Sequence, residues 1–200
     1  IIRTPVFSSR GQLICEPGYY AQDRLLYIPH DGNIKVSTNP TKEEIQDAKA
    51  LLEDDILVDF NFVSPADRTH AMAYILLFFC REMIDGPTPL HIFEAAKQGT
   101  GKTLLAESLM KTLTLDKYSI ISKPDDKELG KKITSSVLSD VSGFCLDNVV
   151  ELKSPLLAQI LLTQKYNDRQ LGTNRQINTA IRWVWAATGN NIAVDTDIAR

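Results

Sequence analysis

The chain has 200 residues, of which 44% are hydrophobic and 24% charged, and its formal net charge is −3 at pH 7. This composition excludes both a disordered chain and a broadly basic one, so any nucleic-acid-binding surface must be local. The longest apolar run, residues 71–80, is far shorter than a membrane-spanning helix, which needs roughly 20 residues, and no signal peptide is recognisable. We therefore expect a cytoplasmic protein with no membrane partner. Its three cysteines form no CxxC pair and indicate neither disulfides nor zinc.

Residues 1–38 predict a small β-rich region. Short apolar runs such as Pro5-Val6-Phe7 alternate there with turn residues such as Ser8-Ser9-Arg10-Gly11, which is typical of small hairpins joined by tight turns. We expect this region to serve structural packing. Because the chain begins with isoleucine and stops at Arg200, directly after a candidate functional segment, we also expect it to be part of a longer polypeptide.

Residues 39–86 predict a helical linker or accessory region. Thr41, followed three positions later by Glu44, forms a capping-box pattern for a first helix. Ser64-Pro65 marks the start of a second helix, with proline in its first turn, that runs to about Ile84. The first of these segments is acidic, so nucleic acid is not expected to bind there.

Residues 87–200 predict an α/β core. Short apolar strands alternate there with helix-like segments, and such alternation implies a parallel sheet covered by helices on both faces, a three-layer sandwich. The expected strands lie at Leu90, Tyr118–Ser122, Ser142–Val150 and Trp183–Asn191, and the expected helices begin near Lys102, Asp125 and Ser154.

The segment that follows the strand at Leu90 has the pattern of a phosphate-binding loop and a helix start. Gly99 and Gly101 allow the tight turn that brings backbone N–H groups to phosphate oxygens, and the helix dipole adds positive potential. Lys102 is expected to reach the β- and γ-phosphates of ATP, and the Thr103 hydroxyl to ligate Mg²⁺. These features predict a P-loop NTPase. The expected nucleotide-binding residues are Gln98, Gly99, Thr100, Gly101, Lys102, Thr103 and Leu104.

One position of this loop departs from the usual pattern. Ala96 stands where G-x-x-x-x-G-K-[ST] has its first glycine. Alanine is small enough for the loop if its backbone angle is ordinary. The alternative interpretation is an exposed Gly/Thr loop before a helix.

A carboxylate, Asp147, ends the apolar run of residues 142–146. Downstream of a phosphate loop, an aspartate in this position holds Mg²⁺; the alternative is a turn-forming aspartate. The next residue is Asn148, where many such ATPases have a glutamate that polarises the attacking water. An amide orients water but cannot take its proton. Either hydrolysis is slow or another carboxylate accepts the proton of the attacking water. Glu94 and Glu151 are the two candidates for that role.

A basic hairpin is expected between residues 165 and 182, around the turn residues Gly172-Thr173-Asn174. It has four basic residues and one acidic residue in an otherwise acidic protein, which favours contact with a nucleic-acid backbone. The alternative is a solvated hairpin that contacts a neighbouring subunit, since Tyr166 is the only aromatic residue available for base stacking. The expected nucleic-acid-binding residues are Lys165, Arg169, Arg175 and Arg182.

The last strand, residues 183–191, ends in polar side chains. Because the carboxyl ends of parallel strands line the ligand crevice, Asn190 or Asn191 is expected to bond the γ-phosphate or the attacking water. Arg200 is a candidate cation presented to phosphate across a subunit interface, or else a surface residue. The expected catalytic residues are Lys102, Asp147, Asn148, Asn190 and Arg200.

The chain resembles the AAA+ ATPases in the order of its motifs. These are residues 98–103, residues 146–148, the basic hairpin, residues 187–191 and residues 197–200. Within that family the chain is most similar to helicase-like domains of phage and mobile-element replication proteins, which are often attached to a primase. The resemblance covers about residues 88–200 and implies five parallel strands, a hexameric ring, a Walker lysine, a sensor asparagine and a DNA-contacting hairpin. Because only four of the five strands and no helical lid are recognisable, the resemblance implies a core that is truncated before its last strand and lid.

Three functions are weighed. The first is an ATP-driven nucleic-acid motor that uses Mg²⁺, as in DNA replication. The second is a slowly hydrolysing, nucleotide-gated module for assembly or loading, which Asn148 motivates. A small-molecule kinase is weaker, because no acceptor-binding segment is recognisable.

Overall fold

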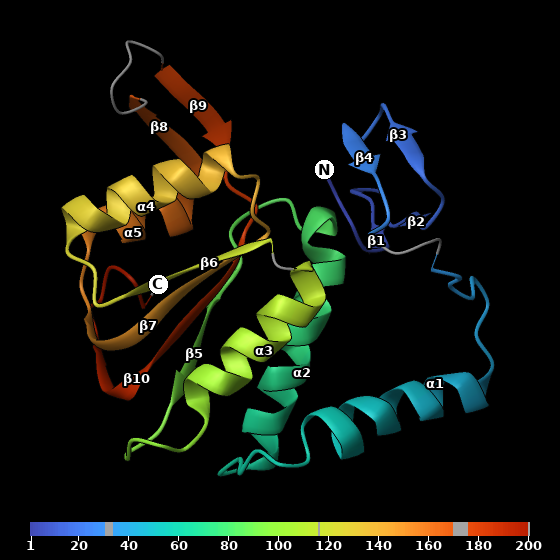
Figure 1. Ribbon diagram of the computed structural model, residues 1–200, viewed down its shortest axis with the longest axis horizontal. Helices are drawn as coiled ribbons and strands as arrows, with labels where there is room; N and C mark the ends of the chain where they lie inside the picture. Colours follow the sequence, from blue (N-terminus) through green and yellow to red (C-terminus); the bar gives the residue numbers. More distant parts are fainter. Residues whose placement is uncertain (31–33, 116, 170–175, 200) are drawn as a thin grey trace. The chain divides into compact units, whose positions relative to one another are not determined.

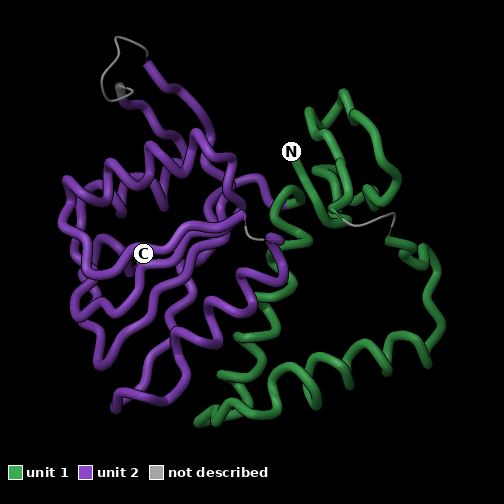
Figure 2. Tube along the Cα trace, in the orientation of Figure 1, with its two compact units in different colours: residues 1–83 green, residues 84–200 purple. Residues whose placement is uncertain are grey.

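A computed structural model describes residues 1–30, 34–115, 117–169 and 176–199 (Figure 1). The chain divides into two compact units, Ile1–Met83 and Ile84–Arg200 (Figure 2). Among the described residues, no helix has both the length and the apolar character needed to cross a membrane.

Two small antiparallel hairpins begin the first unit, as the alternation of apolar and turn residues predicted. Strand β1 (Val6–Phe7) pairs with β2 (Leu13–Ile14), and β3 (Gly18–Tyr20) pairs with β4 (Leu25–Tyr27). Their buried core consists of Val6, Ile14 and Tyr27. This small core holds the two hairpins together.

The two predicted helices of this unit both form, each with a capping box. Helix α1 (Lys42–Ala50) begins after Thr41, whose hydroxyl accepts the Glu44 N–H, and continues as a π-helical turn over Leu51–Ile56. None of the residues of α1 is buried. Helix α2 (Pro65–Cys80) begins after Ser64 and passes into a 3₁₀ turn, Arg81–Met83. The helical segment thus ends at Met83, next to the expected end near Ile84, and its last turn is the tighter 3₁₀ form.

The second unit is built on a four-stranded parallel sheet with the strand order β5-β10-β7-β6. Helices flank it, which confirms the predicted α/β fold with a parallel sheet. The strands are β5 (Leu90–Glu94), β6 (Tyr118–Ser122), β7 (Gly143–Leu152) and β10 (Val184–Val194), and the helices are α3 (Lys102–Thr114), α4 (Asp126–Leu138) and α5 (Pro155–Thr163).

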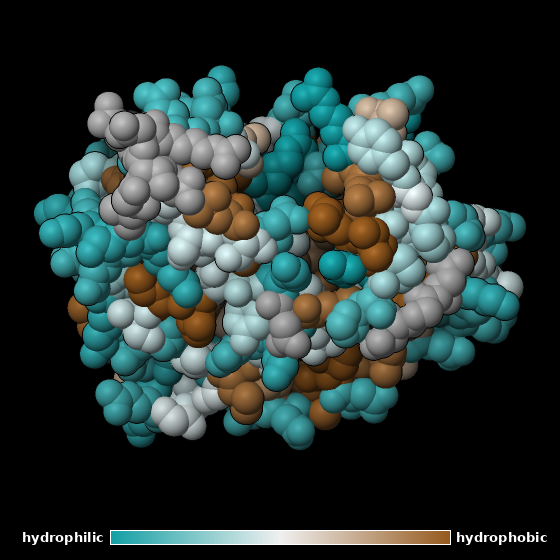
Figure 3. Space-filling model, turned by 45° about the horizontal axis from the view of Figure 1, so that its top comes forward, coloured by the Kyte–Doolittle hydropathy of each residue, from teal (hydrophilic) through white to brown (hydrophobic). Residues whose placement is uncertain are grey.

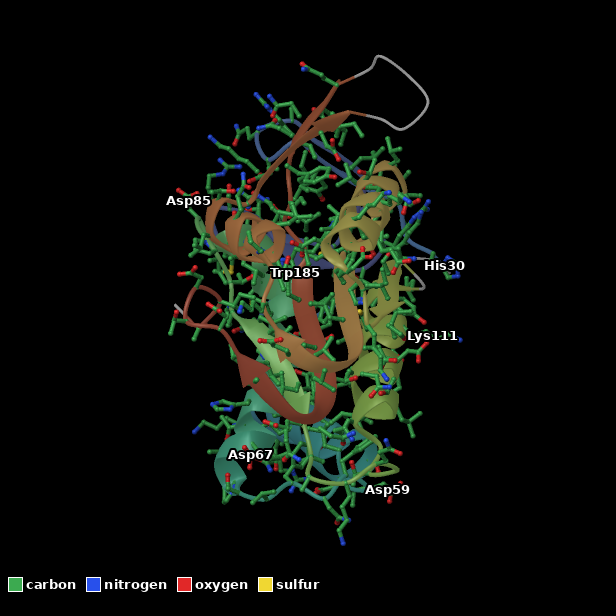
Figure 4. The ribbon with its side chains drawn as sticks, turned by 90° about the vertical axis from the view of Figure 1, so that its left-hand side faces the viewer. His30, Asp59, Asp67, Asp85, Lys111 and Trp185 are labelled. Carbon is green, nitrogen blue, oxygen red and sulfur yellow. The ribbon has the colours of Figure 1, made fainter. Side chains whose placement is uncertain are left out.

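The sheet carries α3 on one face and α4 with α5 on the other (Figure 1). Alternate residues of each strand point to opposite faces, so Phe144 and Trp185 join the core beneath α4 and α5. Figure 4 labels Trp185. Phe144 stacks on Trp183 with ring centroids 5.1 Å apart. Outside the core, hydrophobic residues come to the surface in patches between hydrophilic ones (Figure 3).

A separate antiparallel hairpin, β8 (Lys165–Arg169) with β9 (Gln176–Ala180), precedes β10. This pairing agrees with the predicted hairpin; the turn expected at residues 172–174 lies outside the described residues. Tyr166 anchors the hairpin, because its buried hydroxyl lies 2.7 Å from Thr134 Oγ1 of α4 and 2.8 Å from Asp168 Oδ2. Burial raises the pKa of Tyr166 to about 12, so this hydroxyl remains a donor at neutral pH.

The sequence suggested that β7 and β10 end at their polar residues, but both strands continue beyond them. Leu146 pairs with Ala187 and Val149 with Gly189, so two residues of β7 face one of β10. A second bulge follows in β10 between Gly189 and Ala193. Because a bulge lets polar side chains project while pairing resumes beyond it, both strands continue for several residues.

The second bulge has no room for a side chain at Gly189. A Cβ atom there would lie 2.1 Å from the Val149 carbonyl oxygen. We expect Gly189→Ala to lower the free energy of unfolding by about 2 kcal/mol or more, because backbone must shift. Urea denaturation of the chain measures this.

Gly130→Ala in α4 is the matched control. Its Cβ would meet only Leu156 Cδ2, at an ordinary 3.5 Å. In a helix interior this exchange should raise the free energy of unfolding by about 0.5–1 kcal/mol. Equal effects of the two substitutions would show that the bulge tolerates a side chain.

Candidate functional site

The loop between β5 and α3 has the backbone that its glycines predicted. Gly99 and Gly101 have φ values of 76° and 83°, a left-handed conformation that glycine adopts without steric cost. Ala96 is not among the residues with positive φ. Alanine at the first position of the pattern therefore requires no strained backbone.

Helix α3 begins without a side-chain cap. Gly101 is its N-cap residue and supplies no side-chain hydrogen bond, and the first N–H groups of a helix have no partner within the helix. The N–H groups at Lys102, Thr103 and Leu104 therefore form, with the helix dipole, a surface suited to an anion.

The Lys102 ammonium folds back over this loop. Its Nζ donates to the Lys97 carbonyl oxygen at 3.2 Å and to Thr100 Oγ1 at 3.3 Å. Both acceptors are neutral and exposed. A phosphate oxygen in the same place would offer the ammonium a stronger, charge-assisted hydrogen bond.

Asp147 lies at the meeting point of four elements. Three hydroxyls donate to its carboxylate: those of Thr103 from α3 and Thr188 from β10 reach Oδ1, each at 2.8 Å, and that of Ser122 from β6 reaches Oδ2 at 2.9 Å. The structure thus brings together Thr103 and Asp147, the two residues that the sequence predicted as Mg²⁺ ligands.

These hydrogen bonds set the charge of Asp147. Burial by itself raises the pKa of the carboxyl, but the hydroxyls of Thr188, Thr103 and Ser122 and the Asn148 N–H together lower it below its ordinary value. Asp147 is therefore a carboxylate at neutral pH, the form that a cation requires.

The donor set fits Mg²⁺ held jointly with a nucleotide. Among the described residues, no group of three or more His, Cys, Asp or Glu side chains could hold a metal ion by itself. Mg²⁺ commonly takes few protein ligands, with phosphate and water completing its octahedron. The Thr103 hydroxyl donates its proton to Asp147, so its lone pairs remain available to a cation.

Asn148 is exposed, and its backbone has a left-handed φ of 54°. Its N–H donates to Thr188 Oγ1 at 3.0 Å. Of the carboxylates considered as replacements for the missing glutamate, Glu94 accepts the Ile192 N–H at 2.6 Å and so fixes the bulge of β10. Glu151 is exposed, in the part of β7 that pairs with Ala193.

Asn190 and Asn191, the two candidates at the polar end of β10, differ in burial. The Asn190 Oδ1 atom is enclosed and has no hydrogen-bond partner among the described residues. Asn191 is exposed and has a left-handed φ of 49°. A side-chain acceptor that lacks a donor favours Asn190 as the residue that bonds a ligand or water. Arg200 lies outside the described residues.

The basic hairpin is described only in part. Lys165 is exposed and Arg182 half-buried. Arg175 and the side chain of Arg169 lie outside the described residues. Tyr166 is 3% exposed, so it packs against α4 and is not available to stack on a base.

Sequence reasoning missed two residues of the site, Ser122 and Thr188. Each is a polar residue near the carboxyl end of an apolar strand, beside the strand that carries Asp147. That position was the available signal, because carboxyl ends of neighbouring parallel strands meet at one edge of a sheet.

Comparison with protein-family models found none that matches this chain, and a search of curated proteins found no similar sequence.

The hydrogen bonds to Asp147 predict a pH-dependent contribution to stability. Because they lower the pKa of the folded state, the contribution is fully present above the unfolded pKa, about 3.9, and is lost as the pH falls through the folded value. Near pH 7 the urea concentration at the midpoint of unfolding should be higher for the wild-type protein than for Asp147→Asn. The difference between the two midpoints should shrink below about pH 4.

Asp59→Asn serves as the control for the loss of one negative charge. Asp59 is exposed and lies in the first unit (labelled in Figure 4). A difference between wild type and Asp147→Asn that stays constant from neutral pH to pH 3 would contradict the described role of the three hydroxyls.

Proposed function

We propose that this chain is a P-loop ATPase of the AAA+ kind that binds and hydrolyses Mg-ATP and acts as a helicase-like motor on nucleic acid. The observation that carries the proposal is the 2.8 Å hydrogen bond from Thr103, at the start of α3, to Asp147 on β7. It joins a glycine-rich loop with an unpaired helix N-terminus to an ionised carboxylate.

The loop would hold the nucleotide phosphates. Backbone N–H groups from Gly99 to Leu104 would bond phosphate oxygens, and Lys102 would exchange its two neutral acceptors for the β- and γ-phosphates. Thr103 and Asp147 would hold Mg²⁺, which would neutralise charge on the phosphates when bound.

Hydrolysis requires a water oxygen to attack the γ-phosphorus while the bond to the bridging oxygen of ADP breaks. The partnerless Oδ1 of Asn190 can accept a hydrogen bond from that water. The exposed Asn148 amide can orient it but cannot accept its proton, which passes to phosphate or solvent.

The hairpin supports the assignment of nucleic acid as the partner. Four basic residues and one acidic residue lie between positions 165 and 182, a local charge of +3, suited to a phosphate backbone. The hairpin immediately precedes β10, and Thr188 and Asn190 lie farther along that strand. A single strand thus leads from the proposed nucleic-acid contact to the proposed nucleotide site. A ring of several copies, with Arg200 presented to a neighbour's nucleotide, belongs to the same proposal.

Asn148 favours a second candidate, a nucleotide-gated assembly or loading module that hydrolyses slowly. No carboxylate follows Asp147 directly, and Glu94 is engaged by the Ile192 N–H. Rapid multiple-turnover hydrolysis supports the motor. Tight Mg-ATP binding with turnover that nucleic acid does not accelerate supports the module.

Lys102→Ala tests the nucleotide site. We expect at least a roughly 100-fold loss of ATP hydrolysis, because a charge-assisted donor to the transferring phosphate disappears. Lys97→Ala removes an exposed lysine of the same loop whose backbone carbonyl, not its side chain, contacts Lys102, and should change the rate little. Hydrolysis stimulated by DNA that survives Lys102→Ala would sink the proposal.

Lys165→Ala combined with Arg182→Ala tests the hairpin. If both residues contact phosphates, the slope of log K against log salt for single-stranded DNA should fall by about 1.4, or 0.7 for each contact. Lys111→Ala on α3, away from the hairpin (Figures 1 and 4), is the single-charge control. Unchanged affinity and slope in the double variant would remove the hairpin from the nucleic-acid surface.

A further inference from the structure

Thr188 lies at the centre of the site although no sequence motif identified it. Its side chain is 1% exposed. Its hydroxyl donates to Asp147 Oδ1 at 2.8 Å and accepts the Asn148 N–H at 3.0 Å. The Thr103 hydroxyl donates to the same Oδ1 atom. The Thr103 and Thr188 hydroxyl oxygens therefore lie 3.3 Å apart as two donors to one acceptor.

The contact with Asn148 replaces a missing strand hydrogen bond. At the bulge, Asp147 and Asn148 together face Thr188 of β10, and a bulge leaves backbone groups of its extra residue without the regular ladder partner. The Thr188 hydroxyl takes the place of that partner for the Asn148 N–H. It thereby closes the bulge from the β10 side.

Asp147 alternates with Leu146, which lies in the core beneath α4 and α5, so the regular part of β7 already points the carboxylate to the other face, and the bulge follows directly. The carboxylate faces α3 and meets Thr103, whereas Val149, directly after the bulge, packs in the core beneath α4 and α5. One hydroxyl therefore contacts both the carboxylate and the backbone bulge that directly follows it.

We propose that Thr188 is a positioning residue for Mg²⁺: by bridging the Asp147 carboxylate and the Asn148 backbone, it holds the carboxylate toward the phosphate loop. The inference rests on the proposed function, since it concerns the cation that accompanies the nucleotide. Thr188 is not expected to touch the nucleotide itself, which the loop and Lys102 bind.

Thr188→Val keeps the shape of the side chain and removes the hydroxyl, whereas Thr188→Ser keeps the hydroxyl. In Thr188→Val we expect the Mg²⁺ concentration for half-maximal tightening of ADP binding to rise about 10-fold, the lower end of what outer-shell partners of a metal site contribute. ADP affinity in EDTA should remain within about twofold of wild type, because the loop contacts are intact. Thr188→Ser should keep the Mg²⁺ requirement within about threefold of wild type.

Ser122→Ala is the matched control for the loss of one hydroxyl donor. Ser122 pairs with Asp147 from β6 and donates to its Oδ2, but the Asn148 N–H donates to Thr188 and not to Ser122. Its Mg²⁺ requirement should shift less than that of Thr188→Val. Equal shifts in the two variants, or a 10-fold shift in Thr188→Ser, would overturn the positioning role, because the number of donors alone would then explain the effect.

Amide hydrogen exchange without nucleotide gives a second readout. The Asn148 amide should be protected in wild type and Thr188→Ser and should exchange at least about 10-fold faster in Thr188→Val, since it loses the Thr188 hydroxyl and keeps only its interaction with the Asp147 carboxylate. Rapid exchange in wild type would overturn the inference even if Thr188→Val does not fold. If wild type binds no Mg-nucleotide, the proposed function fails, while exchange at Asn148 still decides whether Thr188 holds the bulge.

Discussion

The site depends on one ionised carboxylate, Asp147, held by hydroxyls from three other elements. Thr103, Ser122 and Thr188 come from α3, β6 and β10, and all donate to it within 2.9 Å. A partly buried carboxylate is costly unless it is hydrogen-bonded. The three donors remove that cost, and they do so only when the register of β6, β7 and β10 is correct. The fold and the charge of the site are therefore set together.

The bulges resolve a conflict between pairing and chemistry. A regular strand would alternate its side chains strictly between the two faces. The site instead requires polar groups at Asp147 and Asn190 while β7 and β10 continue to pair beyond them. Left-handed backbone at Asn148 and Asn191 and the absence of a side chain at Gly189 make this possible. Asparagine adopts that conformation more readily than most residues, which gives Asn148 a structural reason besides its chemistry.

The conformational preference of asparagine bears on the choice between a motor and a slowly hydrolysing assembly or loading module. If backbone conformation favours asparagine at position 148, its presence does not by itself indicate that hydrolysis was lost. Asn190 on β10 supplies an acceptor that has no hydrogen-bond partner among the described residues. The hairpin supplies positive charge before the start of the same strand. These features support the proposal that the site hydrolyses the nucleotide and does not only bind it.

Local patterns in the sequence were sufficient for the elements and for much of the site. Periodicity, caps and glycines predicted the α/β order, the helix starts at Thr41, Ser64 and Ser154, and the loop at Gly99 and Gly101, because these features depend on neighbouring residues. The sequence also paired Thr103 with Asp147. Only the tertiary structure decided which strand lies between β5 and β7, and so placed Thr188 and Ser122 on the carboxylate. It also showed that Tyr166 is an anchor and that the strands run on through their bulges. Strand order and bulges arise from contacts between residues far apart in the chain, and local propensity does not encode them.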